Sequence, residues 1–266
     1  MSIRHIRNIW QYKDFIFASV KREFQSKYQN SILGAAWVVI NPLAMVLVYT
    51  VIFSQVMQAK LPGGNPSFAY SIYLCSGIFT WGLFAEIVGR GQNIFIDNAN
   101  IIKKLNFPRV TLPIIMLISA VLNFMIIFGL FVVFLVFSGQ FPGWTFLAII
   151  PVLLVQIMFS MGLGMSIGVL NVFFRDVGQL FTILMQFWFW LTTIIYPITV
   201  LPEVLRPIVL NINPLAPVIM SYHTILVDAE LPDWSTLITP LICSIVLCII
   251  AIRLFSRHTH DIVDEL

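Results

Sequence analysis

Six long apolar runs with almost no central charge constrain this chain more than any other feature. About 20 apolar residues cross the hydrocarbon core of a bilayer as a helix. Charged residues make up 10% of the 266 positions, against roughly 25% in soluble domains, so a water-soluble globule is excluded. The predicted fold is an all-α integral membrane protein with six transmembrane helices. The predicted spans are 31–57, 68–88, 110–137, 146–174, 177–196 and 237–254.

Three of these runs are longer than a straight crossing requires. The first, third and fourth contain Pro42, Pro113 and Pro151. A proline inside a helix kinks it, and surplus length is also absorbed by tilt. We therefore expect tilted or kinked helices in these three runs.

The lysines and arginines orient the spans. With the N-terminus in the cytoplasm, 13 of the 15 basic residues lie on the cytoplasmic side, and only Lys60 and Arg206 lie outside. Cytoplasmic loops of membrane proteins carry such an excess. Six spans then return the C-terminus to the cytoplasm.

The segment 197–235 is neither a span nor an ordinary loop. It contains six prolines, and its apolar stretches at 204–210 and 215–227 are too short to cross a bilayer. Irregular backbone at membrane depth is tolerated where it faces protein or a water-filled path. We expect short re-entrant helices between the fifth and sixth spans.

The segment before the first span has the pattern of an amphipathic helix. Its apolar residues recur at three- and four-residue spacing, and charged residues occupy the other faces. It is either a passive surface anchor or a docking surface for a cytoplasmic partner. The apolar residues are Ile9, Tyr12, Ile16, Val20, Phe24 and Tyr28, and the predicted contact residues are Lys13, Asp14 and Arg22.

A second cytoplasmic surface is predicted in the loop 91–109. This loop exceeds the about 2 to 8 residues usual between packed helices, and its first half has helical spacing. It is either a basic topology signal or a contact for a soluble partner, with Asp97, Asn100 and Lys103 as the candidate contact residues.

Glu86 and Arg90 are the ionisable candidates inside a predicted span. A charge buried in the membrane costs at least about 2.5 kcal/mol, so such residues are functional candidates. Their i,i+4 spacing also fits a structural pair that partly neutralises itself. Both interpretations stay open.

Aromatic residues concentrate in the second and fifth spans. Trp and Tyr at span ends usually form interface belts. Alternatively, flat rings that line an interior path would stack on sugar faces. The candidates for such a path, together with Glu86 and Arg90, are Trp81, Phe187, Trp188, Trp190 and Tyr196.

Two common enzyme signatures are missing from the sequence. It contains neither a G-x-x-x-x-G-K-[ST] phosphate-binding loop nor an H-E-x-x-H zinc motif. The four histidines form no set with cysteines or carboxylates that predicts a metal site. We expect no cofactor on this chain, and any ATP and Mg²⁺ belong to a partner subunit.

Several short motifs resemble one family in their order and spacing. Residues 100–113 read NIIKKLNFPRVTLP, and 213–217 read NPLAP. Together with single residues elsewhere in the chain, they resemble the polysaccharide-export branch of type-2 ABC transporter permeases over nearly the whole length. These single residues are Tyr12, Lys13, Arg22, Lys27, Tyr28, Ser31, Leu33, Gly34, Trp37, Pro42, Arg175 and Asp176.

The resemblance implies a homodimer in which each permease docks one ATPase subunit. It also implies that the N-terminal helix and the segment 93–104 receive the motion of the ATPase, and that a lipid-linked glycan passes through a central path. O-antigen exporters of bacterial inner membranes are the most similar group, with teichoic acid and capsule exporters as relatives. The expected layout is an interface segment (1–30), a six-span permease domain (31–257) and a cytoplasmic tail (258–266).

Three alternatives remain open. A drug or small-lipid exporter of the same superfamily would share the architecture. A membrane enzyme acting on polyprenyl lipids would need paired acids or a metal site. A secondary transporter is disfavoured because the sequence has one intramembrane carboxylate and no internal repeat.

Overall fold

The computed structural model describes residues 12–28, 34–51, 69–104, 110–258 and 261–266, and all regular structure in these ranges is helical. The predicted all-α class is thereby confirmed for these ranges. Ile9 and the outer parts of the first predicted span, 31–33 and 52–57, lie outside the described residues.

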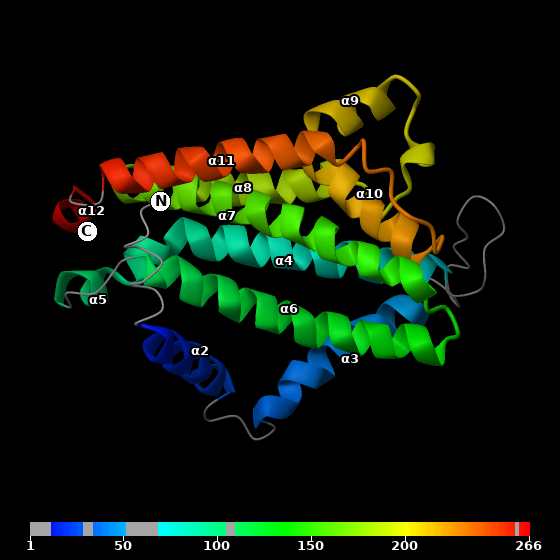
Figure 1. Cartoon of the computed structure of the whole chain (residues 1–266), viewed down its shortest axis with the longest axis horizontal. Coiled ribbons are helices and arrows are strands. Elements are labelled where there is room, and N and C mark those ends of the chain that lie inside the picture. Colours follow the sequence, from blue (N-terminus) through cyan, green and yellow to red (C-terminus); the bar gives the residue numbers. More distant parts are fainter. Residues whose placement is uncertain (1–11, 29–33, 52–68, 105–109, 259–260) are drawn as a thin grey trace.

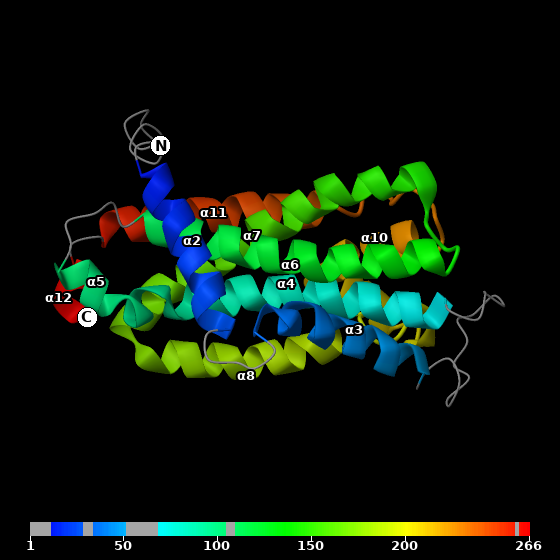
Figure 2. The same ribbon diagram turned by 90° about the horizontal axis from the view of Figure 1, so that it is seen from below.

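Four helices are long and apolar enough to cross a membrane. They run side by side along the long axis of the molecule (Figures 1 and 2). In α4, 72% of the most apolar stretch is buried, but in α11 only 17% is, so α4 is central and α11 faces outward. The four are α4 (Ala69–Asp97), α6 (Thr111–Phe137), α7 (Ile149–Phe173, preceded by the 3₁₀ turn η3, Gly143–Ala148) and α11 (Ile238–Arg257).

Glycines allow α4 and α7 to approach closely. A Cβ atom on Gly168 would collide with the carbonyl oxygen of Gly91, and one on Gly164 would lie 3.1 Å from Cα of Val88. In a membrane, where lipid is as apolar as the helices, close packing of small residues holds helices together. The α4–α7 pair is therefore the packed centre of the bundle.

Two predicted spans correspond to shorter helices. Helix α3 (Trp37–Tyr49) follows a short turn, η1 (Gly34–Ala36), and α8 (Arg175–Leu191) has 17 residues. At 1.5 Å per residue α8 is about 25 Å long, less than the hydrocarbon thickness. Where six spans are predicted, the described ranges thus show four long candidate spans and the two shorter helices α3 and α8.

The three prolines differ in their effect. Pro113 and Pro151 lie in the first turns of α6 and α7, where a proline is tolerated because its missing N–H has no helical partner. Only Pro42 lies well inside a helix, α3. A proline kink is therefore not required in α6 or α7.

Short helices cover the two ends of the bundle (Figure 1). At one end lie α5 (Ala99–Lys104) and α12 (Asp261–Glu265). Toward the other lie η4 (Ile198–Val200), α9 (Leu205–Ile212) and α10 (Leu215–Leu226). The segment 197–235 thus contains two short α-helices, and their re-entrant course stays a prediction.

The N-terminal segment forms the helix α2 (Lys13–Tyr28). It crosses the bundle obliquely (Figure 2). Its apolar residues Ile16 and Val20 are buried, and α2 contacts α6. This helix therefore rests on protein with its apolar face.

Candidate functional site

An open groove of about 530 Å³ runs between α4 and α8. On α4 its lining residues follow helical spacing, so they form one face of that helix. The wall combines aromatic rings with two glutamine amides and a threonine hydroxyl. Its lining residues are Trp81, Ala85, Gly89, Gln92, Thr182, Met185, Gln186, Phe189 and Trp190.

The side chains in the groove are held in place. The Trp81 ring packs edge-on against Phe189 at 5.5 Å between centroids, and Phe189 packs edge-on against Trp190 at 5.5 Å. Gln92 donates a hydrogen bond from Nε2 to Oγ1 of Thr182 at 3.2 Å. Aromatic walls with a few polar groups are typical of sites that bind organic ligands.

The residues predicted to line a substrate path do not all lie in the groove. Trp81 and Trp190 line the groove. Phe187 points outward and is 63% exposed, whereas Trp188 packs edge-on against Phe84 and donates from Nε1 to Oδ1 of Asn213 at 2.8 Å. Neighbouring residues on a helix point about 100° apart, so this run of aromatics cannot share one face.

Tyr196 and the tyrosines of α4 fix the chain beyond α8. The Tyr196 hydroxyl donates to the carbonyl of Trp190 at 2.7 Å. From α4, the Tyr70 hydroxyl donates to the carbonyl of Ile195 at 2.9 Å, and the single proton of the Tyr73 hydroxyl is shared between the carbonyls of Thr193 and Tyr196, each 2.9 Å from the Tyr73 oxygen. These bonds attach the non-helical segment after α8 to the central helix.

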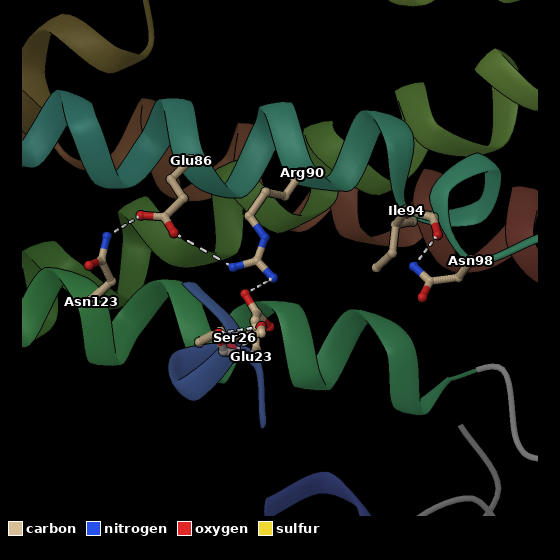
Figure 3. A network of polar contacts seen from close by, with 8 residues as sticks. Glu23, Ser26, Glu86, Arg90, Ile94, Asn98 and Asn123 are labelled. Carbon is tan, nitrogen blue, oxygen red and sulfur yellow. Dashed lines mark hydrogen bonds and ion pairs between the residues drawn. The ribbon is translucent and has the colours of Figure 1, made fainter. Parts of the chain in front are cut away.

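A polar network lies on a different face of α4 (Figure 3). Arg90 forms an ion pair with Glu23 of α2 at 2.7 Å and a longer one with Glu86 at 3.6 Å. From α6, Ser119 donates to Glu23 and Asn123 donates to Glu86, both at 2.8 Å. The predicted Glu86–Arg90 pair is confirmed, and it extends to two further helices.

Glu86 and Asn123 also border a second pocket. This pocket has a volume of about 220 Å³ and lies between α3, α4 and α6, with mostly apolar walls. Glu86 and Arg90 do not line the groove between α4 and α8. The structure therefore separates them from the path candidates Trp81 and Trp190.

Sequence reasoning missed three members of this network. Glu23 is hidden among the charges of an amphipathic segment, and nothing in its spacing indicates a partner in α4. Ser119 and Asn123 gave a usable signal, because they are polar residues four apart within an apolar helix and so lie on one face.

The predicted docking residues lie on exposed surface toward one end of the bundle. On α2 these are Lys13, Asp14 and Arg22. Asp97, Asn100 and Lys103 are exposed at the junction of α4 and α5 and along α5. Beneath them, Asn98 donates to the carbonyl of Ile94 at 2.8 Å, which stabilises the end of α4.

The described residues form neither a metal site nor a nucleophile elbow. Among them, no group of three His, Cys, Asp or Glu is placed to hold a metal ion. Residues 164–168 read G-x-S-x-G, the pattern of a nucleophile elbow. An elbow requires a strand-to-helix turn, but Ser166 lies within α7 and donates to the carbonyl of Gly162 at 2.7 Å.

Comparison with known proteins agrees with this architecture. Residues 15–227 match the family described as ABC-2 type transporter. The O-antigen export system permease protein RfbA of Myxococcus xanthus is 29% identical over 99% of this chain and 100% of its own length. RfbA of Klebsiella pneumoniae is 29% identical over 97% and 96%. The polysialic acid transport protein KpsM of Escherichia coli is 20% identical over 68% and 69%.

Proposed function

Because the chain belongs to the ABC-2 type transporter family, we propose that it is the membrane permease of an ATP-driven exporter of a lipid-linked polysaccharide, specifically O-antigen. The observation that carries this proposal is the full-length similarity to two O-antigen export permeases. The more distant similarity to a polysialic acid transport protein supports the same substrate class. The export step would cross the bacterial inner membrane.

ATP hydrolysis is assigned to a partner subunit, because the sequence has no phosphate-binding loop of its own. ATP and Mg²⁺ would bind that partner. Its docking surface on this chain would comprise α2 and α5, with Lys13, Asp14 and Arg22 on the first, and Asp97, Asn100 and Lys103 at the second. Two permeases and two ATPase subunits would form the complete exporter.

Six spans are proposed for each permease. The four long helices provide four, and the apolar sequence on either side of α3 supplies enough residues for another. Helix α8, extended by the segment that Tyr70 and Tyr73 hold, would be the sixth. The short helices α9 and α10 would then be re-entrant from the outer side, and both termini would be cytoplasmic.

The groove between α4 and α8 is the proposed glycan contact. Sugar rings have an apolar face that stacks on aromatic rings, and their hydroxyls pair with amides such as Gln92 and Gln186. Trp81 and Trp190 would contact the glycan, whereas Trp188 and Tyr196 would position the wall. Glu86 and Arg90, which lie on another face, would act by linking α4 to α2 and α6.

The test is deletion of the gene in a strain with a measurable surface glycan, followed by complementation. We expect deletion to abolish the surface glycan and leave glycan on its lipid carrier inside the cell. Trp190 lines the groove and is 63% exposed. A Trp190→Ala variant should support at least about fivefold less export than the wild type, the effect of losing about 1 kcal/mol from a ring contact. Trp144→Ala is the matched control, because Trp144 is 88% exposed and lies outside the groove.

The same deletion strain tests one alternative function. A drug or small-lipid exporter of the same family would leave the surface glycan of the deletion strain unchanged and alter its sensitivity to toxic compounds. That result would reject the polysaccharide substrate and retain the family.

A further inference from the structure

The helices α5 and α12 meet at one end of the bundle (Figure 1), where α12 contacts both α5 and α7. They contain six and five residues. A helix this short is not stable alone in water, because nucleation costs more than one turn of hydrogen bonds returns. Their positions must therefore come from the packing of their side chains.

Each of the two helices inserts one isoleucine into the main core. Ile262 of α12 is 0% exposed and Ile102 of α5 is 5% exposed, and both belong to the same apolar cluster. Leu266, the last residue, packs against this cluster. Ile262 and Leu266 are thus part of the packed body.

His258, which follows the last turn of α11, is also fixed. His258 packs edge-on against Phe173 at the end of α7, with 5.3 Å between ring centroids, and its Nδ1 lies 2.9 Å from Oδ2 of Asp261. One turn earlier, Phe255 stacks on Phe95 of α4 at 5.7 Å. The end of α11 and α12 together border the part of α4 from which α5 emerges.

With Ile102 turned inward, α5 exposes Asn100 and Lys103. We propose that α12 is a positioning element that holds α5 in this orientation, so that residues 261–266 maintain the surface to which the ATPase subunit docks. The positioning itself depends only on packing, whereas its consequence for the ATPase rests on the proposed function.

The test is amide hydrogen exchange on the full-length permease, purified without its partner. We expect Ile262→Asp to accelerate exchange in the peptide covering α5 at least about tenfold, because a charge at a core position raises the population of the locally open state. Peptides from the centre of α7 should exchange as in the wild type. Glu265→Gln is the control, since Glu265 is an exposed residue of the same helix, and deletion of 261–266 is a second, independent variant.

Copurification of the ATPase with each variant distinguishes the positioning role of α12 from the docking role of α5. Faster exchange in α5 together with weaker copurification supports both roles. Faster exchange with unchanged copurification supports the positioning role of α12 and removes α5 from the docking surface. Unchanged exchange in α5 for both Ile262→Asp and the deletion overturns the inference, whatever the ATPase does.

Discussion

Arg90 shows how one side chain joins two helices. Its bond to Glu23 in α2 is shorter than its bond to Glu86 in its own helix, at 2.7 Å against 3.6 Å. Pairs this exposed contribute about 0–1 kcal/mol in water, but the effective dielectric constant falls toward the bilayer and strengthens them. The Arg90–Glu23 pair therefore links α2 to α4, and the bond from Ser119 to Glu23 links α2 to α6.

A double-mutant cycle measures that contact. We expect Glu23→Gln and Arg90→Gln to lower stability each, and the double variant to lose less than the sum, with a coupling energy of about 1 kcal/mol. The measurement is thermal unfolding in detergent. The control cycle pairs Glu23→Gln with Arg175→Gln, because Arg175 starts α8 and is exposed. If the losses of stability in the Glu23–Arg90 cycle are additive, the ion pair does not stabilise the contact between α2 and α4.

At the scale of elements, the α4–α7 pair depends on the absence of side chains. Gly91, Gly164 and Gly168 lie where the two backbones touch. A glycine inside a helix costs about 1 kcal/mol relative to alanine, so its presence here is explained by the close approach. Any added Cβ atom must push the helices apart.

Gly168→Ala should therefore destabilise the protein by about 1–3 kcal/mol, despite the higher helix propensity of alanine. The matched control is Gly129→Ala in α6, because Gly129 is also helical but a Cβ atom added to it would meet no other atom within 4 Å. We expect that control to be neutral or slightly stabilising. Equal melting temperatures for the two variants would mean that α4 and α7 are not in close contact in the membrane.

Periodicity and hydropathy predict most of these elements, because each depends on its own residues. The four long helices, α2, and the helices α9 and α10 follow from apolar runs and their breaks. The groove does not, because it depends on which faces of α4 and α8 meet. Trp188 and Trp190 are equally aromatic in the sequence, yet one packs into the core and the other lines the groove. The partner of Arg90 also lies in a different helix, so spacing along α4 reveals only Glu86.

At the scale of the whole molecule, charge differs between the two ends of the bundle. Arg253 and Arg257 end α11, and Lys103 lies on α5 at the same end. Asp228, Glu230 and Asp233 lie beyond α10 at the other end. There, hydrogen bonds from the hydroxyl and the backbone N–H of Ser235 lower the pKa of Asp233. The lysine and arginines at the first end predict that this end faces the cytoplasm.

Cysteine labelling in intact cells tests the orientation. In a background without native cysteines, a membrane-impermeant maleimide should label Glu230→Cys from outside. Lys103→Cys should be labelled only after the inner membrane is opened. Both residues are exposed, so a difference between them reports the side of the membrane and not burial. Labelling of Lys103→Cys in intact cells would reverse the proposed topology and remove α5 from the ATPase side.

The outward face of α8 bears on the proposed homodimer. Its large apolar side chains are exposed, with Leu180 at 61%, Ile183 at 53% and Phe187 at 63%, and one side of the groove is open. Either lipid or a second permease could cover such a face. Only a second permease would also enclose the groove. A glycan in the groove requires this enclosure, because its hydroxyls would otherwise contact hydrocarbon.

Single cysteines at Ile183, Leu184 and Phe187 should therefore form disulfide-linked dimers in oxidised membranes. We expect at least one position to react strongly, because it would lie near the two-fold axis of the proposed dimer. A cysteine at Ile250 on α11 is the control, since that side chain is also exposed, at 42%, on a helix that contacts α7 on its inner side. If none of the three α8 positions gives a dimer while ATP-driven export continues, α8 is not the interface between two permeases.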